Sequence, residues 1–136
     1  MQQLGEEAIK TRGMASFGLA GGSTPLAAYA DFAASGMPWE KVNLALIDER
    51  FVPLSDSQSN EANIGKAFSA VKNRLHRWQG LYHEAESIEA CADRSGMAMK
   101  DFILPFDVTV IGMGTDGHFA GRQRPAFRTR PFSFGL

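Results

Sequence analysis

Three short apolar runs, each ending in glycine or acidic residues, restrict the folds that this chain can adopt. They occupy residues 15–20, 43–47 and 108–111, and the segments between them carry apolar residues at helical spacing. Strands that alternate with helices need crossover connections, which place the strands in parallel and the helices on the faces of the sheet. The sequence therefore predicts an α/β fold in which helices cover both faces of a parallel sheet.

The segments between the runs predict three helices. One follows Ser23 and Pro25, an N-cap residue and a first-turn proline, and continues through residues 26–33. The last is expected over residues 88–102. Between these two, another helix is expected to end at Gly80, because apolar residues recur before it at steps of three and four, as on one face of a helix. These residues are Ile64, Phe68, Val71, Leu75 and Trp78.

A polar segment follows each apolar run, and ligands of parallel sheets collect at the carboxyl ends of strands. The first segment contains Gly21, Gly22 and Ser23. The glycines allow close backbone approach, and the following helix N-terminus presents free N–H groups to an anion such as phosphate. An ordinary strand-to-helix turn with Ser23 as its cap explains the same residues. The two interpretations are compatible.

The second segment contains Asp48 and Arg50, followed ten residues later by Asn60. An acid and a guanidinium at a strand end can position a hydroxylated, anionic substrate, because arginine pairs with phosphate through two hydrogen bonds. Alternatively, the two charges form a solvated surface ion pair, and Asn60 caps the helix that follows.

The third segment, residues 112–118, reads G-M-G-T-D-G-H. It fits the dinucleotide-binding pattern G-x-G-x-x-G, but the acidic residue expected about 20 positions later is missing, so we reject that function. The segment presents Asp116 and His118. Histidine titrates near neutral pH and can take a proton from water, although a structural role explains an isolated histidine equally well.

Composition excludes several other classes of protein. No apolar run approaches the roughly 20 residues of a membrane-spanning helix, so no membrane partner is expected. The single cysteine, Cys91, rules out an internal disulfide, suits a reducing cytoplasm and is expected to be a packing residue. No metal site is expected, because no ligand-type residues have zinc spacing, and Ser23 lies outside the G-x-S-x-G element of serine hydrolases.

Charge is distributed unevenly along the chain. Because four of the 14 basic residues lie after Ala120, residues 1–120 carry 10 basic and 15 acidic side chains, a net charge of −5. A segment with this net negative charge binds nucleic acid poorly, since phosphate neutralisation needs clustered cations. Nucleic acid is therefore excluded as a partner.

Taken in order, the three polar segments resemble the signature sequences of the 6-phosphogluconolactonase family, which is related to the glucosamine-6-phosphate deaminases and isomerases. The matches are residues 21–25 (GGSTP), residues 48–53 (DERFVP) with Asp56, Ser59 and Asn60, and residues 112–120 (GMGTDGHFA). The resemblance covers about residues 15–120. Arg50 favours the lactonase branch, because the deaminases usually have a tyrosine there.

The resemblance implies a Rossmann-like fold and hydrolysis of a small phosphosugar lactone, 6-phosphoglucono-δ-lactone, to 6-phosphogluconate in the pentose phosphate pathway, without a cofactor. It assigns activation of the attacking water to His118, with Asp116 orienting the loop or the imidazole. Substrate contacts are expected from Gly21, Gly22, Ser23, Asp48, Arg50, Asn60, Gly114 and Gly117. Two alternatives stay open: a phosphosugar deaminase or isomerase, and a non-catalytic phosphosugar-binding remnant.

The same comparison divides the chain. Residues 1–120 are expected to form a partial domain of this family, with residues 4–12 in place of a longer first helix. Residues 121–136 depart from the pattern and form an atypical basic tail, either translated out of frame or acting as a disordered arm for an acidic partner. We therefore expect a truncated chain with a sheet that is incomplete at its C-terminal side. The family's function and the activity of this chain are separate questions.

Overall fold

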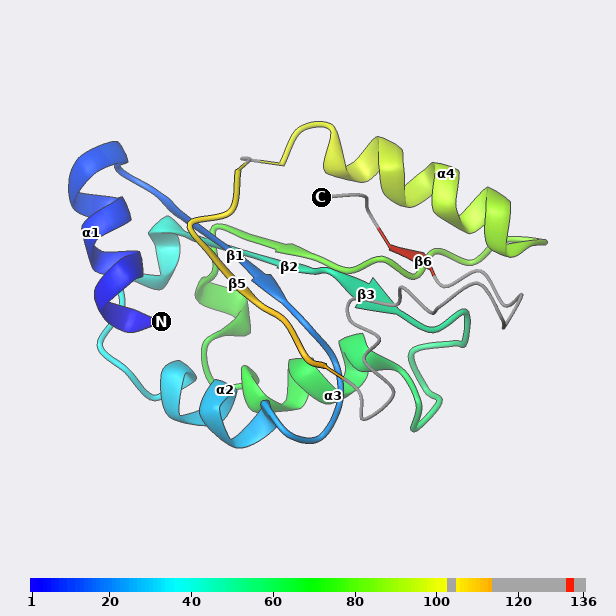
Figure 1. Ribbon diagram of the computed structural model, residues 1–136, viewed down its shortest axis with the longest axis horizontal. Helices are drawn as coiled ribbons and strands as arrows, with labels where there is room; N and C mark the ends of the chain where they lie inside the picture. The colour runs from blue at the N-terminus through cyan, green and yellow to red at the C-terminus, as the bar shows by residue number, and fades with distance from the viewer. Residues whose placement is uncertain (103–104, 114–131, 134–136) are drawn as a thin grey trace.

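A four-stranded parallel sheet organises the chain (Figure 1). The computed structural model describes residues 1–102, 105–113 and 132–133. The sheet has the order β4-β2-β1-β5, and every neighbouring pair is parallel. Its strands are β1 (Ala15–Leu19), β2 (Val42–Leu46), β4 (Arg77–Gln79) and β5 (Val108–Val110). The three strands expected from the apolar runs are confirmed, with bounds shifted by a residue at most.

Helices cover both faces of the sheet, as predicted (Figure 1). The α-helices are α1 (Gln2–Arg12), α2 (Leu26–Ala33), α3 (Asn60–Ala67) and α4 (Ile88–Met99). The first three pack on the face that carries Phe17 and Leu19, whereas α4 and the turn after it cover the opposite face at Ala45. Among the described residues, none of these helices has the length and apolarity that a membrane crossing needs.

The helix predicted to run to Gly80 is wrong beyond Ala67. After α3 the chain forms a 3-10 turn, η2 (Lys72–Arg74), and then β4, in which Trp78 pairs with Leu44. Phe68 and Val71 are buried as their spacing indicated. The spacing of apolar residues indicated correctly which side chains are buried. It does not distinguish one long helix from a helix, a turn and a strand that pack against the same core. Trp78 also favours strand, because aromatic residues pack well on a pleated surface.

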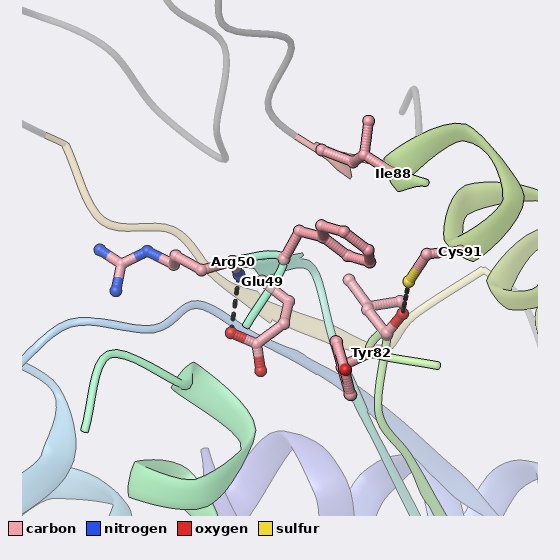
Figure 2. A pocket seen from close by; sticks show the side chains of 7 residues that line it. Glu49, Arg50, Tyr82, Ile88 and Cys91 are labelled. Carbon is pink, nitrogen blue, oxygen red and sulfur yellow. Dashed lines mark hydrogen bonds between the residues drawn. The ribbon is translucent and has the colours of Figure 1, made fainter. Parts of the chain in front are cut away.

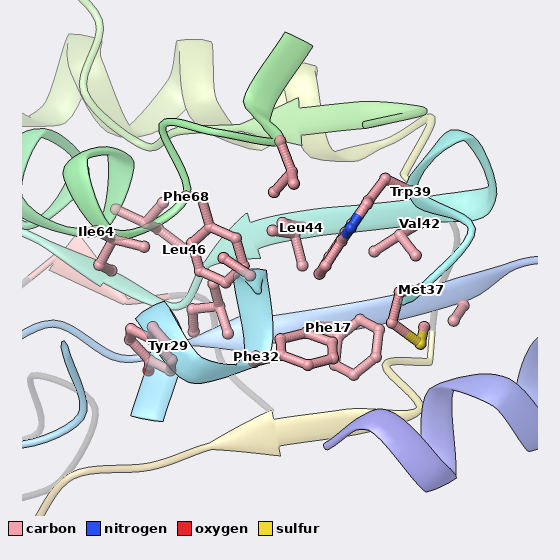
Figure 3. Packing of buried hydrophobic residues seen from close by; sticks show 14 of the residues in the cluster. Phe17, Tyr29, Phe32, Met37, Trp39, Val42, Leu44, Leu46, Ile64 and Phe68 are labelled. Atoms are coloured by element: carbon pink, nitrogen blue, oxygen red, sulfur yellow. The ribbon is translucent and has the colours of Figure 1, made fainter. Parts of the chain in front are cut away.

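Aromatic side chains fill the larger core, between the sheet and α2 (Figure 3). Phe68 is fully buried, and its ring centroid lies 6.0 to 6.3 Å from those of four other rings. These belong to Tyr29, Phe32, Trp39 and Trp78. Tilted and edge-to-face packing of this kind contributes beyond the burial of apolar area, so the core fixes α2 and α3 against the sheet.

Asp107 fixes the register of β5 against β1. Its side chain accepts a hydrogen bond from Ser16 N at 2.8 Å, its own N–H donates to Ser16 O at 2.8 Å, and Arg12 pairs with it. In the resulting register Leu19 lies opposite both Leu46 and Val110. The segments that follow β1, β2 and β5 therefore leave the sheet at the same edge, which we call the carboxyl edge.

Two short segments complete the described structure. The 3-10 turn η1 (Trp39–Lys41) precedes β2 and buries Trp39. Directly after β2, strand β3 (Asp48–Glu49) pairs antiparallel with β6 (Phe132–Ser133) in a second, two-stranded sheet. The predicted acidic segment thus begins as a short strand at the carboxyl edge.

Candidate active site

Hydrogen bonds join two of the three predicted segments at the carboxyl edge. Gly21 N donates to Asp48 Oδ1 at 2.9 Å, and Asn60 Nδ2 donates to the backbone oxygen of Asp48 at 3.2 Å. Asp48 is therefore held from both sides, by the loop after β1 and by the first residue of α3. The structure brings these three predicted residues together, and their roles toward a ligand stay predictions.

The contact between Gly21 and Asn60 explains why position 21 is a glycine. A Cβ atom built on Gly21 would overlap the carboxamide of Asn60. Asn60 is buried, so its side chain has no open space into which it can move. The next residue, Gly22, has a positive φ of 93°, a conformation that side chains disfavour. Each glycine of the loop is thus required for a different reason.

Tyr29, on α2, holds the start of this loop through a hydrogen bond. Its hydroxyl donates to the backbone oxygen of Ala20 at 2.8 Å, and its side chain is buried on α2. Burial, and then the negative charge of Asp48, raises the pKa of the Tyr29 phenol well above its ordinary value. The phenol therefore stays protonated and keeps its hydrogen bond. From the sequence, Tyr29 belongs to the helix predicted over residues 26–33 and has no expected role at the site.

Ser23 is exposed and does not cap α2, so that part of the prediction is wrong. The helix begins at Leu26, Pro25 takes the N-cap position, and no side chain of the described residues caps it. The cause is a tight turn in which Leu26 N reaches Ser23 O at 3.4 Å, so the backbone rather than the hydroxyl of Ser23 meets the helix. The hydroxyl is left at the surface of the carboxyl edge.

Asn60 does not cap α3 either. The cap is Ser59, whose Oγ accepts from Ala62 N at 3.1 Å, and Asn60 is the first helical residue. Because Ser59 takes the capping role, the Asn60 side chain is free to bond to the backbone of Asp48.

Arg50 directly follows β3, in the segment of Asp48, and is exposed. Its Nη1 donates to the backbone oxygen of Gln58 at 2.8 Å. The alternative of a surface ion pair is not observed, since the salt bridge found among the described residues joins Arg12 and Asp107 instead. A guanidinium tied at one nitrogen keeps its other donors available to an anion.

A shallow surface depression, too small to enclose a water molecule, lies beside Arg50 (Figure 2). Its lining is mainly apolar: Glu49, Arg50, Phe51, Leu81, Tyr82, Ile88 and Cys91. The Cys91 thiol is buried, donates to Leu81 O at 3.6 Å and accepts from His83 N at 3.3 Å. Within the described part of the chain, no three histidine, cysteine or acidic side chains are grouped to hold a metal ion.

The third segment leaves the sheet at the same edge, immediately after β5. Ile111, Gly112 and Met113 follow that strand and are exposed. The remaining predicted site residues, Gly114, Asp116, Gly117 and His118, lie outside the described residues. Their assignments stay predictions.

Glu49 also belongs to this region, although it is not among the predicted site residues. It is 6% exposed, and its carboxylate accepts four hydrogen bonds. The donors are Arg50 N, Asn60 N and Glu61 N, each at 2.7 Å, and Ser59 Oγ at 3.1 Å. No local sequence signal marks it, because Glu49 precedes the start of α3 at Asn60 by 11 residues and charged residues are usually exposed.

Comparison with known proteins agrees with this arrangement. The sequence model of the family described as glucosamine-6-phosphate isomerases/6-phosphogluconolactonase matches residues 1–121. The chain belongs to this family. The resemblance seen in the three polar segments is thereby confirmed.

Relatives in the family are named as lactonases. The 6-phosphogluconolactonases of Mesorhizobium japonicum and Rhizobium meliloti are 40% and 39% identical to this chain over 113 residues. The match covers 83% of this chain and 48% and 49% of those proteins. This chain therefore spans about half the length of the curated relatives it matches.

Solved structures confirm the α/β fold. A 6-phosphogluconolactonase from Shewanella baltica is 35% identical and superposes with a TM-score of 0.80, covering 87% of this chain and 51% of that one. The enzyme of the same name from Thermotoga maritima is 29% identical, with a TM-score of 0.76, and covers 86% of this chain and 54% of that one.

Proposed function

We propose that this chain carries the phosphosugar site of a 6-phosphogluconolactonase and hydrolyses 6-phosphoglucono-δ-lactone to 6-phosphogluconate, a step of the pentose phosphate pathway. The observation that carries the proposal is the bond from Gly21 N to Asp48 Oδ1, braced by Asn60. It joins two family segments that are separate in the sequence, at the edge where the third segment also emerges. The names of the relatives supply the reaction.

The hydrogen bonds divide the expected substrate contacts into two groups. The N–H of Gly21 and the amide of Asn60 already bond to Asp48, so we assign these two residues to the scaffold. Gly22, Ser23 and Arg50 are exposed at the carboxyl edge, and we assign them to the substrate's phosphate and hydroxyl groups. Arginine suits the phosphate because its planar fork matches two phosphate oxygens.

In the proposed reaction, His118 takes a proton from water as the water oxygen attacks the lactone carbonyl carbon. Backbone N–H groups of the glycine loops donate to the oxyanion that forms, a contribution of about 3–4 kcal/mol per donor. Collapse of this intermediate breaks the bond to the ring oxygen, which receives the proton from the imidazolium. The product is the open-chain acid, and no redox step or cofactor is involved. Asp116 would hold the imidazole in the tautomer that accepts the proton.

The test is whether the purified chain accelerates lactone opening above the spontaneous rate, measured as acid release at constant pH. We expect acceleration that saturates with lactone, and no ammonia from glucosamine 6-phosphate. Ammonia release would instead identify a deaminase. Binding of 6-phosphogluconate without any acceleration would identify a non-catalytic phosphosugar-binding protein. Either of the last two results contradicts the proposed hydrolysis.

A further inference from the structure

Glu49 stands between two residues of the candidate site but points away from it. Successive side chains of an extended backbone point to opposite sides, so the side chain of Glu49 leaves β3 on the side opposite to its neighbours Asp48 and Arg50. In Figure 2 the side chains of Glu49 and Arg50 extend in different directions. Arg50 is exposed and Glu49 is buried. The Glu49 side chain therefore turns toward the protein interior, whereas that of Arg50 stays at the surface.

The Glu49 carboxylate is fully occupied by the start of α3. Both of its oxygens accept two hydrogen bonds, and two of the four donors are the N–H groups of Asn60 and Glu61. These belong to the first turn of the helix, whose N–H groups have no partner within the helix. A negative charge there is stabilised by the helix dipole as well as by the bonds. These hydrogen bonds therefore fix the position of β3 relative to the first turn of α3.

The same helix start carries the brace on Asp48. Asn60 donates its backbone N–H to Glu49 Oε1 at 2.7 Å and its side-chain amide to Asp48 O at 3.2 Å. Asp48 in turn accepts from Gly21 N. Displacing Asn60 by a fraction of an ångström would therefore lengthen the bonds that hold Asp48 and, through it, the glycine loop.

From this chain of contacts we infer that Glu49, supported by Ser59, is a positioning residue of the phosphosugar site. Its buried carboxylate sets where Asp48, Arg50 and the Gly21 loop lie, and it does not touch the substrate. The inference rests on the proposed function for the identity of the ligand, but the positioning itself is independent of that function.

The chain offers a matched pair of serines for the test. Ser59 and Ser87 are both N-caps, and each accepts from the third N–H of its helix, at 3.1 and 3.2 Å. Only Ser59 also donates to Glu49. Ser59→Ala and Ser87→Ala therefore remove equivalent caps, and only the first disturbs Glu49. Glu49→Gln is the direct variant, because an amide nitrogen replaces one accepting oxygen and leaves one N–H group of the helix start without an acceptor.

The first readout is hydrogen exchange of the Gly21 amide in the full chain, followed by NMR. We expect exchange to become about 10-fold faster in Ser59→Ala and Glu49→Gln, the effect of losing one charge-assisted hydrogen bond, and to stay as in the unaltered chain in Ser87→Ala. Exchange through global unfolding would accelerate the amides of the central strands β1 and β2 as much as that of Gly21, so faster exchange at Gly21 than in these strands reports the local change. If the Glu49→Gln variant does not fold, the Ser59→Ala variant still tests the positioning role of Glu49.

The second readout is the dissociation constant for 6-phosphogluconate, expected to rise about 10-fold in Ser59→Ala and to stay constant in Ser87→Ala. Equal Gly21 exchange in the two serine variants overturns the inference. So does an unchanged dissociation constant in Ser59→Ala, because positioning would then not reach the ligand. If the unaltered chain binds no 6-phosphogluconate, the proposed function fails, and Gly21 exchange alone then supports or overturns the positioning role.

Discussion

Replacing His118 with alanine is expected to lower the rate of lactone hydrolysis by about 100-fold or more, the usual loss when a general base is removed. The family resemblance assigns proton removal from the attacking water to this imidazole, in the segment that leaves the sheet after β5. Initial rates of acid release from the lactone, at saturating substrate, measure the effect. We expect binding of 6-phosphogluconate to change little, because the imidazole acts on water.

The pH profile and a control histidine make this prediction specific. The rate of the unaltered chain should rise with pH as the imidazole loses its proton and becomes a base, and the variant should lose this dependence. His76 is exposed and directly precedes β4. Its backbone N–H donates to Trp39 O and Val42 O, at the end of the sheet opposite to the carboxyl edge. His76→Ala should keep the full rate. Near-normal turnover of His118→Ala would place the base elsewhere.

Replacing Gly21 with alanine is expected to destabilise the protein by about 3 kcal/mol, because the new methyl group would overlap a buried side chain. Asn60 would have to move, and it would give up its bond to Asp48 O. A loss of this size lowers the midpoint of thermal unfolding by on the order of 10 °C. Because the same contacts hold the carboxyl edge, the affinity for 6-phosphogluconate should fall as well.

Gly36→Ala is the matched control for this substitution. Gly36 lies just beyond α2, is exposed, and a Cβ atom there would meet no atom within 4 Å. The same chemical change is therefore expected to leave both the unfolding midpoint and the affinity nearly unchanged. If the two alanine variants unfold at the same temperature, the packing of Gly21 against Asn60 does not constrain the loop.

Much of the fold could be predicted because the relevant signals are local. The apolar runs at residues 15–20, 43–47 and 108–111 end in glycine or acidic residues, and this pattern is characteristic of buried parallel strands. β4 could not be predicted in the same way. Its tryptophan, Trp78, continues the spacing set by α3, and only the pairing with β2 distinguishes a strand from another helical turn.

The candidate site could be predicted in its location but not in its connections. Strand order places the segments of Gly21 and Asp48 at one edge, and this follows from parallel pairing alone. Which polar group bonds to which depends on ångström-scale packing, as the wrongly assigned caps Ser23 and Asn60 show. The burial of Glu49 could not be read from the sequence, because charged residues are usually exposed.

Some predictions are not tested by the described residues. The roles of Asp116 and His118, and the contacts of Gly114 and Gly117, remain proposals. The division of the chain at residue 120 also remains a proposal, with residues 121–136 as a separate basic tail.

The central claim is that three segments at the carboxyl edge form one phosphosugar site, and NMR titration with 6-phosphogluconate tests it most directly. Amide signals from residues 21–24, 48–50 and 112–113 should shift together and reach saturation at one ligand concentration. Signals around His76, at the opposite end of the sheet, should stay in place. Shifts confined to one of the three segments, or found at the opposite end of the sheet, would contradict the claim.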